Sequence, residues 1–324
     1  MFSRFEKPLM QKIFAFMAAQ LALLTFAGAI LAYVYPPLFL LFKGYFLWFF
    51  AATMFALGLV LNVSELKLEL VNPRRVALGV ASQYSVMPLL AWLVAQYPGY
   101  SPAIALGFII VGCAPGAMAS NVIVFLAGGA VAFSVTLTTV STLLSPLLTP
   151  LLVKILGGAI LPVEFWPLTL TIFNTVLLPL LLGLLIQRRL GSYLPVAREL
   201  APGVAALAII IICGYAVAAN QARIADMAGS VLMGVILVNL LGYAAGWLLG
   251  RCYGFQALYR ITLMIELGMQ NAGMGVALAL QHFPAEAALP GALFAVWCIL
   301  TAAAASGWLR RRIRARLELA GESA

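Results

Sequence analysis

Charge is scarce in this sequence. Only 9% of its 324 residues are Asp, Glu, Lys or Arg, whereas 64% are hydrophobic. Soluble domains normally have about a quarter of their residues charged, so this composition argues against a soluble protein. Membrane-spanning helices of about 20 apolar residues account for it. The sequence does not show the strict apolar–polar alternation of transmembrane β-strands. It therefore predicts an all-α polytopic membrane protein.

Residues that bind transition metals are also scarce. His282 is the only histidine, and the four cysteines form no CxxC pair. They are Cys113, Cys213, Cys252 and Cys298. One histidine with scattered cysteines does not indicate a zinc site. We interpret the cysteines as small buried side chains.

Apolar stretches long enough to span a bilayer recur about ten times. They cover residues 12–34, 40–61, 75–97, 103–127, 130–157, 165–187, 202–220, 228–250, 257–282 and 287–309. The first stretch lacks a clear cleavage site, so we expect a transmembrane helix there and not a signal peptide.

The basic residues predict the orientation. With ten spans and the N-terminus inside, 16 of the 19 basic residues face the cytoplasm. They are Arg4, Lys7, Lys12, Lys67, Arg74, Arg75, Arg188, Arg189, Arg198, Arg251, Arg260, Arg310, Arg311, Arg312, Arg314 and Arg316. Only Lys43, Lys154 and Arg223 lie outside. This asymmetry favours two cytoplasmic termini in the inner (plasma) membrane. It also explains the net charge of +9 without nucleic acid.

Helix-breaking residues interrupt two of the predicted spans. Pro115 and Gly116 lie in the middle of the fourth, and the ninth contains three glycines, Gly268, Gly273 and Gly275. Proline removes a backbone donor, and glycine tolerates unwound backbone. Each break falls in the fourth span of a five-span half, so the halves have opposite orientations. The pattern predicts two inverted five-helix repeats whose broken helices, the fourth and ninth, cross. The alternative is that these residues only kink packed helices.

Glu266 is the one acidic residue deep inside a predicted span. A charge there costs about 3 kcal/mol on insertion scales. No Lys or Arg lies at similar depth, so the sequence points to an external cation or a proton as its partner.

Further side-chain oxygens could reach the same cation. Gln83 is in the middle of the third span, and Ser120 and Asn121 follow the first break. One face of the predicted fifth helix carries five hydroxyls, from Ser134, Thr138, Ser141, Ser145 and Thr149. Hydrogen bonds between helices are an alternative role for this face. Carboxylate, amide and hydroxyl oxygens without sulfur or imidazole suit a hard cation, and sodium is the obvious candidate.

Four segments together resemble the bile acid:sodium symporter family, in its bacterial branch. They are GCAPGAMASNV, STLLSPLLTP, IELGMQN and PGALFAVW, and the resemblance covers nearly the whole chain. It implies a core domain of residues 74–157 and 227–316 and a panel domain of residues 1–61 and 163–220.

The resemblance also implies two sodium sites. The first would consist of Ser120, Asn121, Ser134, Thr138 and Glu266. The second would consist of Gln83, Glu266, Gln270 and the backbone carbonyls of Leu267 and Met269. Asn271 would border the substrate. The chain departs from its relatives at Ala117, Met118, Cys298 and Ile299, where they often have smaller or more polar residues. The resemblance therefore defines the coupling to sodium better than it defines the identity of the substrate.

Charge indicates what kind of substrate accompanies sodium. Two sodium ions and one carboxylate leave a net charge of about +1, and the starts of the two half-helices add positive dipole ends. The predicted substrate residues are Met118, Ala119, Asn271, Ala272 and Gly273. We expect a monovalent organic anion. The family resemblance implies that it is a small acid such as pantoate, or a bile acid.

Three other classes are open at this stage. A cation-driven exporter of the arsenite-efflux type would need a thiol near the break, where Cys113 lies. A channel would need a continuous polar pore, and an intramembrane enzyme would need a nucleophile or metal cluster. We expect no enzyme activity. The expected partners are the bilayer and a small organic anion, with no nucleic acid and no obligate protein partner.

Overall fold

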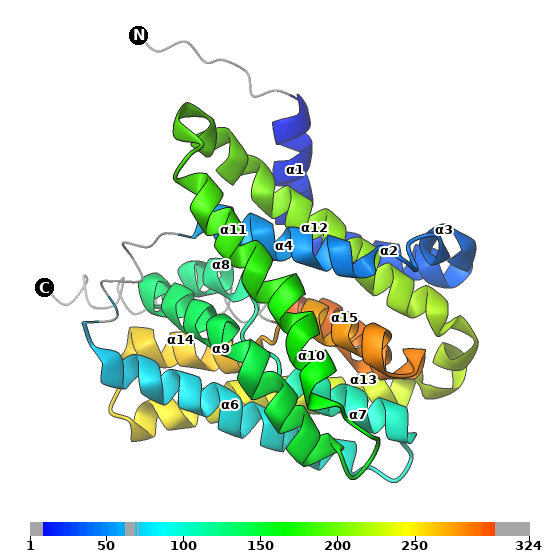
Figure 1. The fold of residues 1–324 in the computed structure, drawn as a ribbon. Helices are drawn as coiled ribbons and strands as arrows, with labels where there is room; N and C mark the ends of the chain where they lie inside the picture. Colours follow the sequence, from blue (N-terminus) through cyan, green and yellow to red (C-terminus); the bar gives the residue numbers. More distant parts are fainter. Residues whose placement is uncertain (1–8, 62–68, 70, 302–324) are drawn as a thin grey trace, which may run out of the picture. The chain divides into compact units, whose positions relative to one another are not determined.

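The described part of the chain is helical. The computed structural model describes residues 9–61, 69 and 71–301, and within these ranges it has no β-strand beyond one isolated bridge (Figure 1). Arg4, Lys7, Lys67 and the basic residues of 310–316 lie outside the described residues. The orientation that they predict therefore stays a prediction.

The chain divides into two compact units, and each is built from two separate segments. The first unit contains Met1–Leu61 and Leu170–Ala222, and the second contains Asn62–Thr169 and Arg223–Ala324. We describe each unit by itself.

The first unit is built around two long apolar helices, α4 (Phe46–Val60) and α12 (Leu194–Ala219). It also contains α1 (Leu9–Ala19), α2 (Leu21–Val34), α3 (Pro36–Leu40) and the short turn Gly191–Tyr193. Of α10 (Phe165–Ile172), the part from Leu170 onward belongs to this unit. The π-helical turn Phe173–Leu177 and α11 (Leu178–Gln187), which follow α10, belong to it entirely.

Small residues let the helices of the first unit approach closely. Gly58 of α4 faces Gly183 of α11, and a Cβ atom at either position would collide with backbone of the other helix. Ala56 packs against Ala201 and Ala205 of α12. Close approach of this kind is what holds helices together in lipid, where burial of leucine gains little.

The second unit contains most of the polar residues singled out above. Its helices are α6 (Pro73–Ala95), α7 (Pro102–Gly112), α8 (Ala119–Leu126), α9 (Val131–Gly157), α13 (Gln221–Cys252), α14 (Ala257–Gly268), α15 (Ala272–His282) and a last helix over Ala285–Thr301. α9 packs against α6, α7, α8 and α14. It is therefore the helix most central to the polar site.

Five helices in the described residues are long and apolar enough to cross a membrane by themselves. They are Pro73–Ala95, Val131–Gly157, Phe165–Gln187, Gly191–Ala219 and Gly229–Cys252. A bent pair, Leu9–Ala19 with Leu23–Val34, makes six if it is one span. On α9, Leu147 and Ile155 are 58% and 64% exposed, which is the surface expected of a helix that faces lipid. The protein is thus a multi-pass membrane protein.

Two predicted spans differ from the helices of the structure, and a third has the predicted bounds but an irregular turn inside it. The stretch 12–34 is two helices that meet at 84°, with the turn at Gln20. The helix predicted over 228–250 begins at Gln221, directly after Asn220. The stretch 165–187 is helical throughout but widens into a π turn just before Pro179, because proline cannot donate the regular helical hydrogen bond.

Candidate functional site

Two helices of the second unit are interrupted at the positions that the sequence indicates. The first ends at Gly112, and its continuation α8 starts only at Ala119 (Figure 1). The second ends at Gly268, and its continuation α15 starts at Ala272. Pro115 and the extended backbone of Met269 prevent helix in the intervening segments.

The two interrupted segments pair with each other. Gly116 and Gln270 form an isolated antiparallel bridge. The Ala117 amide donates to the Met269 carbonyl at 2.9 Å, and the Asn271 amide donates to the Pro115 carbonyl at 2.8 Å. Backbone groups freed by each break therefore satisfy those of the other, and the two breaks cross at one point.

The Glu266 carboxylate lies beside this crossing. Its side chain is only 2% exposed. The Ser120 hydroxyl donates to Oε1 at 2.5 Å, Ser134 also donates to Oε1, and Thr138 donates to Oε2 at 3.0 Å. A Cβ atom at Gly116 would lie 2.8 Å from Oε2, so only glycine leaves room for the carboxylate.

This cluster contains more acceptors than protons. Ser120 Oγ lies 2.6 Å from the Ala117 carbonyl as well as close to Glu266, and Ser134 Oγ lies 2.8 Å from Asn121 Oδ1 as well. Each hydroxyl has one proton and can satisfy one acceptor at a time. No basic side chain in the described ranges forms an ion pair with Glu266. A small hard cation would balance this set of oxygens.

Gln83 and Gln270 lie on the other side of Glu266. Gln83 Nε2 donates to Gln270 Oε1 at 2.6 Å and to the Ala114 carbonyl at 3.0 Å. Gln270 Nε2 donates to the Leu267 carbonyl at 2.8 Å, while the Met269 carbonyl accepts from Ala117. The structure thus brings the members of the second predicted cation set together. Three of their oxygens, Gln270 Oε1 and the carbonyl oxygens of Leu267 and Met269, accept hydrogen bonds from amide groups.

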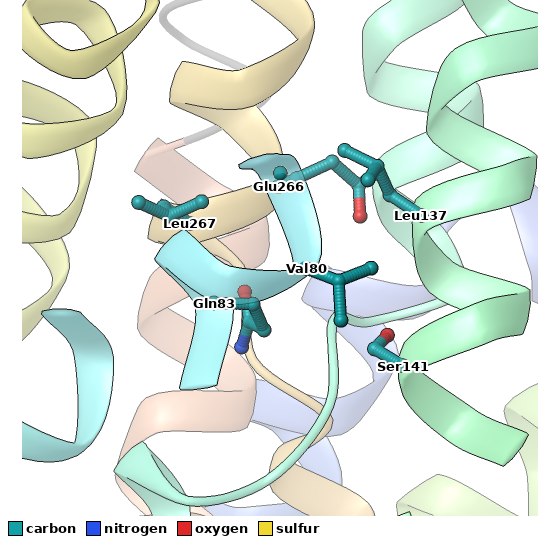
Figure 2. A pocket seen from close by; sticks show the side chains of 7 residues that line it. Val80, Gln83, Leu137, Ser141, Glu266 and Leu267 are labelled. Atoms are coloured by element: carbon teal, nitrogen blue, oxygen red, sulfur yellow. The ribbon is translucent and has the colours of Figure 1, made fainter. Parts of the chain in front are cut away.

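A small cavity lies beside Gln83 and Glu266. It has a volume of about 10 Å³, roughly the space that one water molecule needs. Gly79, Val80, Gln83, Leu137, Ser141, Glu266 and Leu267 line it. Figure 2 shows the Glu266 side chain extending from α14 toward α9, whose Leu137 and Ser141 form the opposite wall. The cavity is too small for an organic anion.

The hydroxyl face of α9 divides into two parts. Ser134 and Thr138 turn to Glu266, as described above. Ser145 instead donates to the Thr142 carbonyl at 2.8 Å, which lacks a helical partner because Pro146 has no amide hydrogen. Thr149 donates at 2.8 Å to the carbonyl of Cys113, at the first break. Thr149 therefore makes the hydrogen bond between helices that was one alternative for this face, while Ser134 and Thr138 face the Glu266 carboxylate.

The predicted substrate residues lie at the starts of α8 and α15. Met118, Ala119, Asn271 and Gly273 are half-buried, and Ala272 is buried. Asn271 caps α15, because its Oδ1 accepts from the Met274 amide at 3.1 Å. At the start of α8, the amides of Ser120 and Asn121 donate to the carbonyls of Ala117 and Met118. These starts therefore offer fewer free donors than the sequence suggested.

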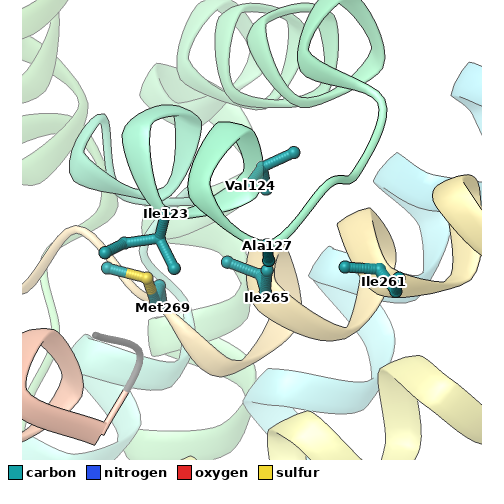
Figure 3. Packing of buried hydrophobic residues seen from close by; sticks show 6 residues of the cluster. All are labelled: Ile123, Val124, Ala127, Ile261, Ile265 and Met269. Atoms are coloured by element: carbon teal, nitrogen blue, oxygen red, sulfur yellow. The ribbon is translucent and has the colours of Figure 1, made fainter. Parts of the chain in front are cut away.

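Apolar packing fixes the first half-helix start. Ile123, Val124 and Ala127 of α8 pack against Ile261, Ile265 and Met269 of α14 and its end (Figure 3). Ile299 of the last helix packs against this cluster, and Cys298 is buried beside it. The Cys113 thiol is fully buried, so it offers no accessible sulfur at the break. Within the described residues, no group of three His, Cys, Asp or Glu side chains could hold a metal.

The sequence analysis missed one polar residue at the breaks, Asn239, and did not foresee the role of another, Thr149. Asn239 of α13 is fully buried and donates at 2.7 Å to the Gly268 carbonyl. Thr149 was noted only as part of a polar face, without its bond to the break. The available signal was that Asn239 is a lone amide within an apolar run, as Gln83 is.

Comparisons with known proteins find similar chains among sodium-dependent transporters. A model of the Sodium Bile acid symporter family matches residues 47–228. The chain is 33% identical over 306 residues to the uncharacterized sodium-dependent transporter YocS of Bacillus subtilis, covering 94% of this chain and 95% of YocS. It is 34% identical over 267 residues to the probable chloroplastic sodium/metabolite cotransporter BASS1 of Arabidopsis thaliana, covering 82% of this chain and 67% of BASS1. The rice BASS1 is 36% identical over 71% of this chain and 57% of its own length.

Proposed function

Because the chain belongs to the Sodium Bile acid symporter family, whose members are transporters and not enzymes, we propose that it carries a monovalent organic anion into the cell together with sodium. The observation that carries this proposal is Glu266. Its carboxylate is buried among three hydroxyls at the crossing of two broken helices, and no basic side chain in the described residues pairs with it.

Two sodium ions would share this carboxylate. One ion would bind Ser120, Asn121, Ser134, Thr138 and Glu266. The other would bind Gln83, Glu266, Gln270 and the carbonyls of Leu267 and Met269. The excess of acceptors over protons supports the first site, and the single-water cavity beside Gln83 and Glu266 supports the second. At the second site, sodium would take the place of the hydrogen bonds that Gln270 Oε1 and the Leu267 carbonyl oxygen accept from side-chain amides.

The anion would bind at the starts of α8 and α15, near Met118, Ala119, Asn271, Ala272 and Gly273. With the Asn271 Oδ1 engaged as a cap, its Nδ2 group remains the side-chain donor for a carboxylate. Two sodium ions against one glutamate favour a single negative charge on the substrate. A small organic acid such as pantoate, or a bile acid, has that charge.

The broken helices imply the transport mechanism. We propose ten spans in two inverted repeats, with α7–α8 as the fourth span and α14–α15 as the ninth. Both termini would be cytoplasmic in the plasma membrane, with Lys154 and Arg223 outside. Residues 74–157 and 227–316 would form the core domain, and residues 1–61 and 163–220 the panel domain. Motion of one domain against the other would give alternating access.

A panel of organic acids tests this function. The purified chain is heated with each acid in sodium chloride and, in parallel, in potassium chloride. A substrate stabilises the folded state by mass action, and coupling requires that it do so mainly in sodium. The proposal fails if no carboxylic acid stabilises the protein more in sodium than in potassium.

A further inference from the structure

The end of α14 leaves the Gly268 carbonyl without its helical partner. In a continuous helix, the Ala272 amide would donate to the Gly268 carbonyl. Here Met269 is extended, with φ −114° and ψ 100°, and the Ala272 amide donates to the Gln270 carbonyl at 2.7 Å. A buried carbonyl without a donor is costly, so something else must satisfy Gly268.

Asn239 supplies the missing donor. It projects from α13, is fully buried, and donates from Nδ2 to the Gly268 carbonyl at 2.7 Å. Its other end, Oδ1, lies 3.0 Å from the Thr301 hydroxyl, whose single proton is shared with the carbonyls of Trp297 at 3.0 Å and Cys298 at 3.2 Å. The amide is thus held between the end of α14 and the last helix.

The first break has the same arrangement. There Gln83, in the middle of α6, donates from its amide to the freed carbonyl of Ala114 at 3.0 Å. Under the inverted repeat of the proposed function, α6 and α13 are equivalent helices. Asn239 then corresponds to Gln83. Each is a carboxamide in the middle of its helix, and each donates to a carbonyl at the broken helix of its own repeat.

The Gly268 carbonyl lies between the two backbone groups proposed as sodium ligands, those of Leu267 and Met269. Orienting one peptide in a short unwound segment restricts the peptides on both sides of it. Without Asn239, the Gly268 carbonyl could regain a partner only if the segment rewound or shifted, and either change would move its neighbours.

We infer that Asn239 is a positioning residue of the second sodium site, held by Thr301. It does not contact the ion in this arrangement. It keeps α14 ending at Gly268 and Met269 extended, the form in which the carbonyls of Leu267 and Met269 can bind sodium. This inference rests on the proposed function for the identity of the ion.

The test measures the sodium concentration that gives half of the maximal thermal stabilisation of the full-length protein, with potassium as the comparison ion. In Asn239→Leu, which has similar volume but no donor, we expect this concentration to rise about tenfold, the equivalent of one lost hydrogen bond. Thr301→Val should raise it less, by about threefold, because the Asn239 donor remains. Thr301→Ser retains the hydroxyl and should restore the wild-type value.

Asn220→Leu is the matched control. Asn220 is also buried and donates to a backbone carbonyl, that of Ala216, at 2.8 Å, but it belongs to the first unit. We expect Asn220→Leu to lower thermal stability without changing the half-saturating sodium concentration.

If Asn239→Leu and Thr301→Val lower stability but leave the half-saturating sodium concentration unchanged, Asn239 is only structural and the inference is wrong. If Asn239→Leu does not fold, the half-saturating sodium concentration of Thr301→Val alone decides whether the inference holds. Failure of the proposed function looks different, because the wild-type protein would then show no sodium dependence.

Discussion

At the scale of single residues, the polar cluster was largely predictable, because an acidic residue inside an apolar helix needs a partner. Glu266 and the two hydroxyls one helical turn apart, Ser134 and Thr138, follow from this reasoning, and the structure places them in contact. The reasoning could not separate residues that face the carboxylate from those that serve the backbone. Ser145 compensates for Pro146, and Asn271 caps α15. Only the path of the backbone reveals such roles.

Gly116 gives a prediction at this scale. In Gly116→Ala the added methyl would lie 2.8 Å from Glu266 Oε2, closer than real carbon contacts allow, so the carboxylate must move. We expect the half-saturating sodium concentration to rise at least about tenfold, as for the loss of one charged hydrogen bond. Gly229→Ala, where the methyl meets no atom within 4 Å, is the control and should not change it. Equal sodium affinity in the two variants would argue against a tight carboxylate site.

At the scale of the helices, length and hydrophobicity predicted which segments are helical, but not where they bend. Pro115 and Gly268 marked the two breaks correctly, because proline and glycine act on the backbone directly, whereas Gly273 and Gly275 lie inside α15. The turn at Gln20 has no such residue, and we have no physical account of it. The early start of α13 was missed because Gln221, Arg223 and Asp226 are polar, while helix formation does not require apolar residues.

The contact of α4 with α11 gives a second prediction. In Gly58→Ala the new methyl would collide with the backbone of α11, so the helices must separate. Overpacking of this kind costs about 1–3 kcal/mol, and we expect the midpoint of thermal unfolding to fall by several degrees. Because the polar cluster lies in the other unit, the half-saturating sodium concentration should stay the same. Gly44→Ala, in open space, is the control. An unchanged midpoint in Gly58→Ala would mean that the two backbones do not approach this closely.

At the scale of the whole molecule, the class of the protein followed from composition alone, and the family followed from four short motifs. The substrate did not follow, since the positions that the family resemblance assigns to it are largely apolar here. Cys298 and Ile299 are packed into the protein, and the Met118 side chain has no hydrogen-bond donor. Binding of the anion would then depend on few polar groups, with Asn271 as the proposed side-chain donor.

Charge movement is the prediction that belongs to the whole transport cycle. Two sodium ions with one monovalent anion carry one net positive charge inward. Each charge gains about 2.3 kcal/mol per 100 mV of membrane potential. In proteoliposomes with a fixed sodium gradient, an inside-negative potential should therefore accelerate uptake, and collapsing it with an ionophore should slow uptake. A rate that does not respond to potential would indicate one sodium ion per anion.

The most direct test of the central claim is sodium binding by Glu266→Gln. Glutamine keeps the size of the side chain and its hydrogen-bonding capacity but removes the charge that we propose both sodium ions share. The measurement is the thermal unfolding of the wild-type and variant proteins over a series of sodium concentrations at constant ionic strength, with potassium as the balancing ion. For the wild type, stability should rise with sodium by mass action, by about 2.7 kcal/mol at 100 times the dissociation constant. For Glu266→Gln, the account predicts a folded protein whose stability does not depend on sodium, and a variant that responds to sodium as the wild type does would contradict it.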